Sequence, residues 1–420
     1  MIALFLYWPF RWYRHYKKPT AGLRIIPTSP IVHSPLTVPL LLLVFWLPVT
    51  LWSSDDRNIS WMAIGYLLFG LTLFVALVHW SPVQRQPAWV AWFLLLGGAG
   101  LAIIAPPFVA WKPEFRLFHL PLYNKLQAIH INIGETIHAN VLAGVLVIVL
   151  PLLLALLLHG ASTGKIGAAG QSRTQINLSP LMLKNAFVHQ SSMIYQFCFT
   201  LLFLLILGVL VLTQSRGGYL AIVIALPVVL LLRWPRLLYA IPIGLLIAFL
   251  IVHQVGIQTI LNQLSTDGSL GGWDGRLDIW TQSFNALHDF AFTGIGIGTF
   301  TLIIPLLYPL HVSIEGYPHA HNLFLQIGVD MGLPGLIAYL ALWINLFVML
   351  ITVLRTRHAT SLQRTLAIGA TGSLTAMLVH GLLDAVTWGT KLAFIPWLLF
   401  ALITLLFLDV EKGRVTALNP

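Results

Sequence analysis

The sequence is divided into apolar runs of about 20 residues, and short segments between them hold most of the charges. A helix of roughly 20 apolar residues crosses the ~30 Å hydrocarbon core of a bilayer. Only 9% of the residues are charged and the mean hydropathy is +0.87, whereas a soluble domain carries about 25% charged residues. A soluble fold this apolar would expose large apolar patches and aggregate. The sequence therefore predicts an all-α protein that crosses a membrane many times.

Ten runs satisfy this length and composition. They are residues 35–52, 60–79, 88–111, 139–158, 193–213, 218–232, 237–256, 333–354, 365–383 and 392–408. The apolar N-terminal stretch and the half-polar segment 294–310 would raise the number to about 12 if they also cross, or they lie in the interface. Because no internal repeat is visible, we expect a single transmembrane domain over residues 1–420.

The basic residues predict how the chain is oriented. With the N-terminus in the cytoplasm, 16 of the 23 Lys and Arg residues lie in cytoplasmic segments. The positive-inside rule favours this topology, with both termini cytoplasmic. A net charge of +10 does not indicate nucleic-acid binding here, because the basic residues lie between apolar runs rather than on one soluble face.

A long loop, residues 257–322, lies on the outer side in this topology. Its apolar residues recur at helical spacing: Leu277, Trp280, Phe284 and Leu287. This spacing predicts a helix with an apolar stripe. The polar residues on its other side are Asp278, Gln282 and Asn285. Loops of this length tend to be functional.

A short outer turn, Ser215-Arg216-Gly217-Gly218, joins the fifth and sixth predicted spans. One interpretation is structural: the glycines allow a tight turn and the arginine extends to the interface. The other is that Arg216 binds an anion. No acidic residue lies beside it in the sequence, and backbone N–H groups of a Gly-Gly turn suit a phosphate. The sequence leaves both interpretations open.

Arg276 is the single Lys or Arg between residues 257 and 320, a stretch with five acidic residues. A salt bridge with Asp274 or Asp278 is the simpler role for it. Alternatively Arg276 and Trp280, one helical turn apart, face the space between the loop and the membrane helices. The guanidinium would bind an anion there.

His319, His321 and Asn322 directly precede a predicted span. A His-x-His pair suits zinc, but the sequence offers no compact set of further ligands around it. A neutral histidine at the mouth of an apolar cavity is also suited to be a general base. We therefore expect a base rather than a metal site.

Two other polar groups have simple explanations beside functional ones. Asp55 and Asp56 would be ligands in a metal-dependent sugar transferase, but Arg57 beside them favours a solvated turn. His380 and Asp384 lie one helical turn apart near the end of a span, where ionisable residues are functional candidates. A mutual hydrogen bond would satisfy them both.

The sequence His321-Asn322, nine residues, and Gly332-Leu-Pro-Gly335 resembles the His-Asn-x9-Gly-x-x-Gly pattern of the O-antigen ligase family. That family includes the lipopolysaccharide O-antigen ligases, the pilin O-oligosaccharyltransferases and, more distantly, the O-antigen polymerases. Three further segments resemble recurrent elements of the family in the same order: His138-Ala-Asn140, residues 215–218, and Arg276-x-x-x-Trp280. The resemblance covers roughly residues 138–384.

The resemblance implies a GT-C-like glycosyltransferase in the bacterial inner membrane. It implies inverting transfer of a glycan from undecaprenyl pyrophosphate to an acceptor hydroxyl at the periplasmic face, without a metal or a cofactor. Arg216 and Arg276 would bind the donor pyrophosphate, and His321 would accept the acceptor's proton. The residues expected to bind substrate are Ser215, Asn322, His319, His138, Asn140 and Trp280. The expected partners are the carrier-linked O-antigen, lipid A-core and the bilayer, and not nucleic acid.

Several alternatives remain. The short polar tail after Leu408 favours a lipid A-core acceptor over a pilin acceptor. An O-antigen polymerase or a protein O-oligosaccharyltransferase of the same superfamily would share the motifs. A transporter for a lipid-linked sugar would place polar sites near the bilayer midplane, whereas the predicted spans are apolar at their centres. A metal-dependent transferase would use Asp55 and Asp56.

Overall fold

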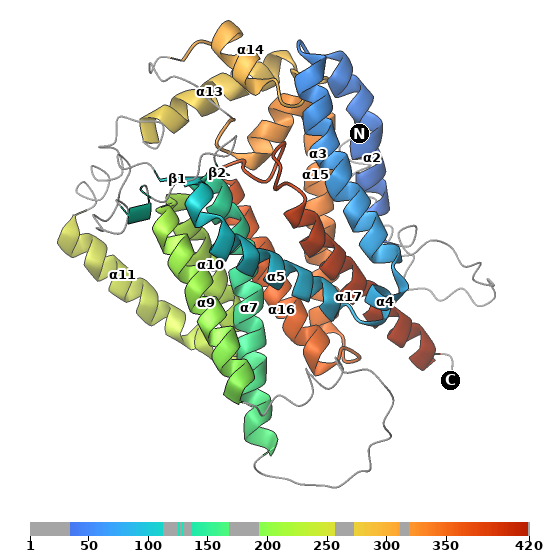
Figure 1. Cartoon of the computed structure of the whole chain (residues 1–420), viewed down its shortest axis with the longest axis vertical. Coiled ribbons are helices and arrows are strands. Elements are labelled where there is room, and N and C mark those ends of the chain that lie inside the picture. Colours follow the sequence, from blue (N-terminus) through green and yellow to red (C-terminus); the bar gives the residue numbers. More distant parts are fainter. Residues whose placement is uncertain are drawn as a thin grey trace.

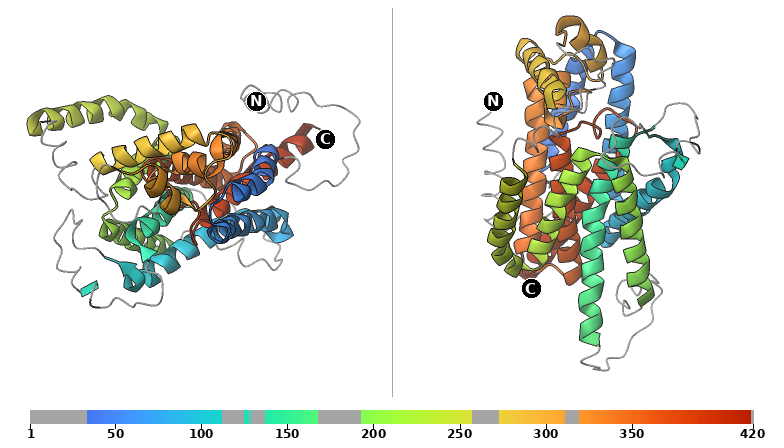
Figure 2. Two further views of the ribbon diagram at one scale, coloured as in Figure 1. Left: turned by 90° about the horizontal axis from the view of Figure 1, so that it is seen from above. Right: turned by 90° about the vertical axis from the view of Figure 1, so that its left-hand side faces the viewer.

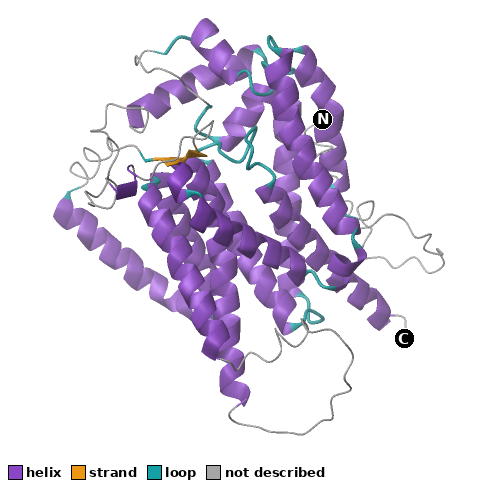
Figure 3. Cartoon of the chain, viewed as in Figure 1, coloured by secondary structure: helices purple, strands orange, loops and turns teal. Residues whose placement is uncertain are grey.

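The computed structural model describes residues 34–111, 125–126, 128, 137–167, 193–256, 273–310 and 319–418. Helices form almost all of this part of the chain (Figure 3), which confirms the predicted all-α class. A helix lies in each of the ten predicted spans. These helices are α2 (Thr37–Trp52), α3 (Arg57–His79), α5 (Ala88–Ile104), α7 (Ala139–Gly167), α9 (Met193–Thr213), α10 (Arg216–Arg233), α11 (Ile241–Val255), α15 (Leu323–Arg355), α16 (Ser361–Gly381) and α17 (Ile395–Leu418).

Five of the described helices are both long and apolar enough to cross a membrane. They lie at Arg57–His79, Ala139–Gly160, Tyr195–Thr213, Arg216–Arg233 and Leu323–Arg355. The helices α2 and α5 are apolar but shorter. Several membrane-length helices in one chain establish a polytopic membrane protein.

All of the ten helices except α11 contribute residues to one large apolar core; α11 contacts η3 (Pro235–Ala240) (Figure 1). On one side α7, α9, α10 and α16 pack together, while α2 packs against α15 and α3 against α17. The helix α5 contacts α7, α9 and α17, and so connects the two sets. The middle of α7, from Leu142 to Leu153, is buried nearly all round, as expected of a helix surrounded by others.

Small residues on α16 allow its neighbours to approach closely. A Cβ atom added to Gly369 would lie 2.9 Å from the Cα of Leu152 in α7. One added to Gly372 would lie 2.7 Å from the Cβ of Pro151 and would also meet Val229 of α10. Close backbone contact at small residues is the usual packing of membrane helices, because lipid supplies no hydrophobic drive for their association.

Three short helical segments connect these helices: α4 (Ser81–Arg85), η1 (Pro106–Phe108) and η3 (Pro235–Ala240). The predicted span 88–111 is too long, because α5 ends at Ile104. Pro106 and Pro107 follow, and proline lacks the N–H that would continue the helix. Two-residue strands β1 (Val109–Ala110) and β2 (Ile137–His138) then pair in parallel, with Ala110 opposite His138.

The predicted span 333–354 is too short, because α15 begins at Leu323. Asn322 caps its N-terminus by accepting from the N–H groups of Phe324 and Leu325. A kink at Gly332 interrupts the helix, with φ of 68°. A side chain there would collide with the carbonyl of Phe292, so the kink needs glycine.

Two helices from the long loop, α13 (Trp273–Asp289) and α14 (Phe300–Leu307), lie across one end of the helix bundle (Figures 1 and 2). The prediction of a helix around Trp280 is confirmed. The apolar stripe forms only part of the buried face. Trp280 and Leu287 pack against the apolar cluster below α13, whereas Leu277 is 43% and Phe284 60% exposed and Gln282 is buried. The reason is close packing of α13 on α15, which places small residues such as Ser283 and Ala286 at the contact.

Replacing Gly372 by valine is expected to destabilise the protein by about 1–3 kcal/mol, because the added methyl groups meet α7 and α10. The thermal unfolding of the purified protein in detergent would measure the loss. The matched control is Gly208→Val in α9, where an added Cβ meets nothing within 4 Å. Equal melting temperatures for the two variants would contradict the close-packing argument.

Candidate active site

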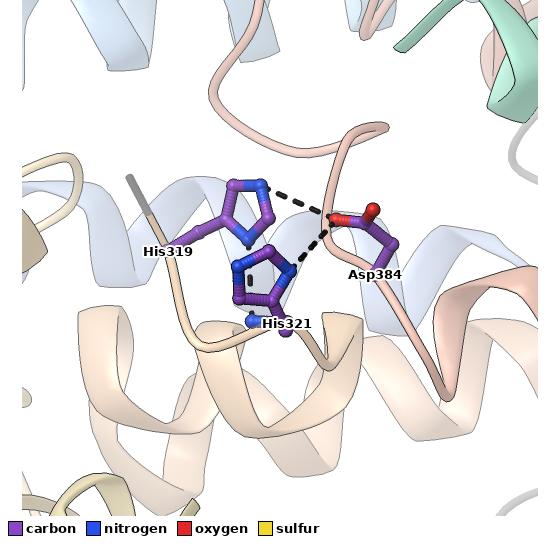
Figure 4. A group of neighbouring side chains, drawn as sticks. All are labelled: His319, His321 and Asp384. Carbon is purple, nitrogen blue, oxygen red and sulfur yellow. Dashed lines mark hydrogen bonds and ion pairs between the residues drawn. The ribbon is translucent and has the colours of Figure 1, made fainter. Parts of the chain in front are cut away.

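Three ionisable side chains meet where α15 begins and α16 ends (Figure 4). The Nε2 atom of His319 lies 3.2 Å from Oδ1 of Asp384. The Nδ1 atom of His321 lies 3.6 Å from the same oxygen. The two imidazole rings are in edge contact, with centroids 4.4 Å apart. One carboxylate oxygen therefore faces two histidines from another part of the chain.

The hydrogen bonds of His319 identify its tautomer. Its Nδ1 atom accepts from the backbone N–H of His321 at 3.2 Å, so Nδ1 carries no proton. The proton is then on Nε2, which faces Asp384. Burial, together with the charges of His321, His138 and Arg276, lowers the pKa of His319 to about 4, although Asp384 opposes this. His319 is therefore neutral at pH 7 and donates to Asp384.

His321 combines a strained backbone with an unsatisfied ring. Its φ of 49° is in the left-handed region, which costs a residue other than glycine free energy and is common at functional sites. The side chain is buried, and neither ring nitrogen has a hydrogen-bond partner among the described residues. Nδ1 faces Asp384, and Nε2, on the other edge of the ring, is buried as well.

Contacts to the preceding backbone hold Asp384 in place. Arg276 of α13 donates from Nη1 to the carbonyl of Leu383 at 2.7 Å. Asn322 donates to the carbonyl of Leu382 at 3.2 Å. Asp384 is itself only 3% exposed. Burial raises its pKa, but the nearby histidines, His319 foremost, outweigh this and hold the pKa well below its usual range.

The surroundings of this group are positively charged. Burial lowers the pKa of Arg276, and the charge of Arg216 lowers it further, while Asp384 opposes both. The guanidinium Nε of Arg276 is buried and has no hydrogen-bond partner among the described residues. Arg276 thus lies near Asp384, and Arg216 is close enough to Arg276 for their charges to interact. Two neighbouring guanidinium groups suit a phosphate or pyrophosphate.

A metal ion is the alternative ligand. The nitrogen and oxygen atoms that His319, His321 and Asp384 offer all lie within 4.8 Å of one another, and these ligand types suit zinc. A divalent cation would, however, add two positive charges near Arg276 and Arg216, and among the described residues of this cluster Asp384 is the one carboxylate that offsets them. The electrostatics therefore favour an anion over a metal.

The N-terminus of α10 reaches the same region. Gln214, with φ of 51°, precedes Ser215, whose Oγ caps the helix by accepting from the N–H of Gly218. A Cβ on Gly217 would lie 3.6 Å from the ring of His380 and 3.4 Å from Leu383. The first turn of α10 therefore packs against the end of α16, and its N-terminal partial positive charge favours an anion beside it.

The other predicted site residues differ in how they relate to the cluster of His319, His321 and Asp384. The charge of His138, on β2, acts on His319. The backbone N–H of Asn140 donates to Nδ1 of His138 at 3.3 Å, so Asn140 orients this histidine from the first turn of α7. Trp280 is half-buried one turn beyond Arg276 on α13. Ser215 and Asn322 serve as helix caps here.

Asp384 was missing from the predicted set of site residues. The sequence placed it near His380 at the end of a span and suggested that the two satisfy each other, whereas Asp384 faces His319 and His321. The available signal was an ionisable residue at that depth. Asp56, by contrast, caps α3 by accepting from the N–H of Asn58 at 2.8 Å, in line with the structural interpretation of that turn.

Acid should destabilise the protein through His319. A folded pKa of about 4, against the usual 6.5, means that the unfolded chain binds the proton first as the pH falls. The contribution of His319 to stability is complete above pH 6.5 and is lost between pH 6.5 and 4, at no more than about 1.4 kcal/mol per pH unit. The melting temperature measured across this pH range should fall less steeply for His319→Gln than for the wild type. An unchanged slope would contradict the assignment of a buried neutral imidazole.

Part of the chain is similar to a known protein family. The family model described as O-antigen ligase matches residues 201–340, a segment that contains Arg216, Arg276 and His321. His138 and Asp384 lie outside the matched segment. No curated protein matches the chain. Residues 201–340 of the chain are therefore similar to the O-antigen ligase family.

Proposed function

We propose that the protein is an O-antigen ligase. It transfers a glycan from undecaprenyl pyrophosphate to a sugar hydroxyl of lipid A-core, with inversion and without a metal. The observation that carries this proposal is the buried His321 beside Asp384, with Arg276 bound to the backbone carbonyl that precedes Asp384. The site thus combines a proton acceptor with binding groups for a negatively charged leaving group.

The donor's leaving group needs charge stabilisation. As the bond between the anomeric carbon and the pyrophosphate oxygen breaks, negative charge grows on the undecaprenyl pyrophosphate. Arg276 and Arg216 supply fixed positive charge, and the N-terminus of α10 adds N–H donors. A pyrophosphate leaves without protonation, so no general acid is required.

The acceptor hydroxyl needs to lose a proton. Nε2 of His321 accepts that proton while the hydroxyl oxygen bonds to the anomeric carbon from the face opposite the pyrophosphate, which inverts the configuration. His321 then carries a positive charge, and the carboxylate of Asp384, 3.6 Å from Nδ1, stabilises it. His319 donates to the same carboxylate and helps to fix its orientation.

The membrane explains where such a site is built. Donor and acceptor are both lipids, so they reach the protein sideways from the bilayer. In the proposed topology the termini are in the cytoplasm of a bacterial cell, and the end covered by α13 and α14 is periplasmic. This topology rests on the excess of Lys and Arg in the segments on the opposite, cytoplasmic side.

His321→Ala should lower the rate of transfer by roughly 10²- to 10⁴-fold, because it removes the general base. The assay is reconstituted transfer of carrier-linked glycan to lipid A-core, with the protein's melting temperature measured in parallel. His288→Ala is the matched control, since His288 is an exposed histidine of α13. Transfer that persists in a folded His321→Ala variant would rule out the base.

Arg276→Lys and Arg216→Lys should each weaken transfer by about 10²-fold, because lysine keeps the charge but loses the bidentate geometry for a pyrophosphate. The donor concentration dependence and direct binding of the carrier-linked donor measure the effect. Arg357→Lys, at an exposed site after α15, is the control. Unaltered donor binding in both site variants would exclude their proposed role.

The product separates this proposal from its nearest alternative. A polymerase of the same superfamily would use the same groups and yield a longer carrier-linked glycan, whereas a ligase yields a lipid A-core conjugate. Running the same reconstitution with and without a chelator tests the metal. Loss of activity in the chelator, with recovery on adding a divalent metal, would contradict the metal-free mechanism.

A further inference from the structure

A second buried carboxylate, Asp330 on α15, lies behind the site and takes no part in the chemistry proposed above. It is 1% exposed. Its two oxygens accept hydrogen bonds from different parts of the chain: Oδ1 from Nε2 of Gln326 at 2.8 Å, and Oδ2 from Nε1 of Trp388 at 2.9 Å. A buried carboxylate is costly unless it is well bonded, so these contacts identify a built network.

The first branch of the network leads to the histidines. Gln326 donates to Asp330, and its Oε1 accepts from the backbone N–H of Ala320 at 2.7 Å. Ala320 lies between His319 and His321. The amide of Gln326 can donate on one side and accept on the other only in the orientation that the carboxylate of Asp330 imposes. Asp330 thereby fixes the turn that carries both imidazoles.

The second branch leads to Asp384. Trp388 lies four residues after Asp384, in the segment between α16 and α17, and its indole N–H donates to Asp330. The indole also packs edge-to-face against Tyr339 of α15, with ring centroids 5.6 Å apart. The segment that carries Asp384 is thus bound to the same carboxylate as the turn that carries His321.

The backbone of Asp330 is fixed as well. Its carbonyl accepts from Oγ1 of Thr50 on α2 at 2.8 Å and from the N–H of Gly296 at 3.2 Å. The kink at Gly332 follows two residues later. The residue is therefore held by α2 and by the segment that joins α13 to α14, independently of the two site segments.

We propose that Asp330 is a positioning residue that sets the separation between His321 and Asp384. It binds the segment of each through a different oxygen. This inference rests on the proposed function, in which the 3.6 Å approach of His321 to Asp384 supports proton transfer. A displacement of about 1 Å at a reacting group can cost 10²-fold in rate, so a link between the two segments matters for catalysis.

Exchanging the two side chains tests this role. In Asp330→Asn the new amide N–H₂ faces either Gln326 or Trp388, both of which are donors there, so one bond is lost. In the double variant Asp330→Asn with Gln326→Glu the contacts of position 330 with position 326 and with Trp388 are complementary again. The backbone N–H of Gly298, which also donates to the Asp330 carboxylate, is the same in both variants. The carboxylate introduced at position 326 accepts from the new amide N–H₂ and from the N–H of Ala320, while the new amide oxygen at position 330 still accepts from Trp388.

The expected result for Asp330→Asn is a kcat lowered roughly 10²-fold with little change in the KM for the donor, because Arg216 and Arg276 are untouched. The double variant should recover most of kcat. Asn345→Leu is the control: Asn345 is also a buried polar residue of α15, but among the described residues its side chain bonds within that helix, to the carbonyl of Ala341. Normal kcat in Asp330→Asn, or no recovery in the double variant, overturns the proposal.

Hydrogen exchange of the backbone separates this inference from the proposed reaction. In Asp330→Asn, peptides that contain Ala320 and Trp388 should exchange faster than in the wild type, and slower again in the double variant. If the wild type had no transferase activity but Asp330→Asn still exchanged faster, the proposed reaction would be refuted, and the role of Asp330 in connecting the two segments would stand. Unaltered exchange in both peptides refutes the link itself.

Trp388→Phe keeps the test decisive if Asp330→Asn does not fold. Phenylalanine retains the packing against Tyr339 and removes only the N–H that reaches Asp330. We expect faster exchange around residue 388 and a lower kcat at unchanged donor KM. A Trp388→Phe variant with wild-type kcat and exchange would overturn the proposal.

Discussion

The burial of Asp384 is the constraint on which the site depends. A carboxylate that is 3% exposed in a largely apolar protein needs partners that offset its desolvation. His319 and His321 come from the start of α15, and Arg276 reaches the neighbouring carbonyl from α13. These segments are far apart in the sequence, so the site exists only when α13, α15 and α16 are packed together.

That packing depends in turn on small residues beneath the site. A Cβ on Gly144 of α7 would lie 3.1 Å from the ring of His380, and Gly217 of α10 approaches the same ring from another side. Lower in the bundle, Gly369 and Gly372 bring α16 against α7 and α10. Larger residues would move the end of α16, and with it Asp384, away from the N-terminus of α10.

The sequence predicts the helices well because each span is a local property: about 20 apolar residues suffice to recognise it. The helix α13 was also predicted, but only part of its buried face was, namely Trp280 and Leu287. Close contact with α15 leaves Gln282 buried and Phe284 exposed. The pattern of hydrophobic residues in the sequence does not predict that contact. The pairing of Asp384 with His321 was likewise hidden, since the spacing to His380 offered an apparent local partner.

The two tasks proposed for the site require opposite electrostatics, and the backbone separates them. A base is strengthened by a nearby negative charge, whereas a pyrophosphate is bound by positive charge. Direct pairing of Arg276 with Asp384 would neutralise both. Arg276 instead donates to the carbonyl of Leu383, so that the Asp384 carboxylate faces the imidazoles of His319 and His321. Because Arg276 binds the carbonyl of the residue before Asp384, its guanidinium lies close to the carboxylate that supports the base without pairing with it.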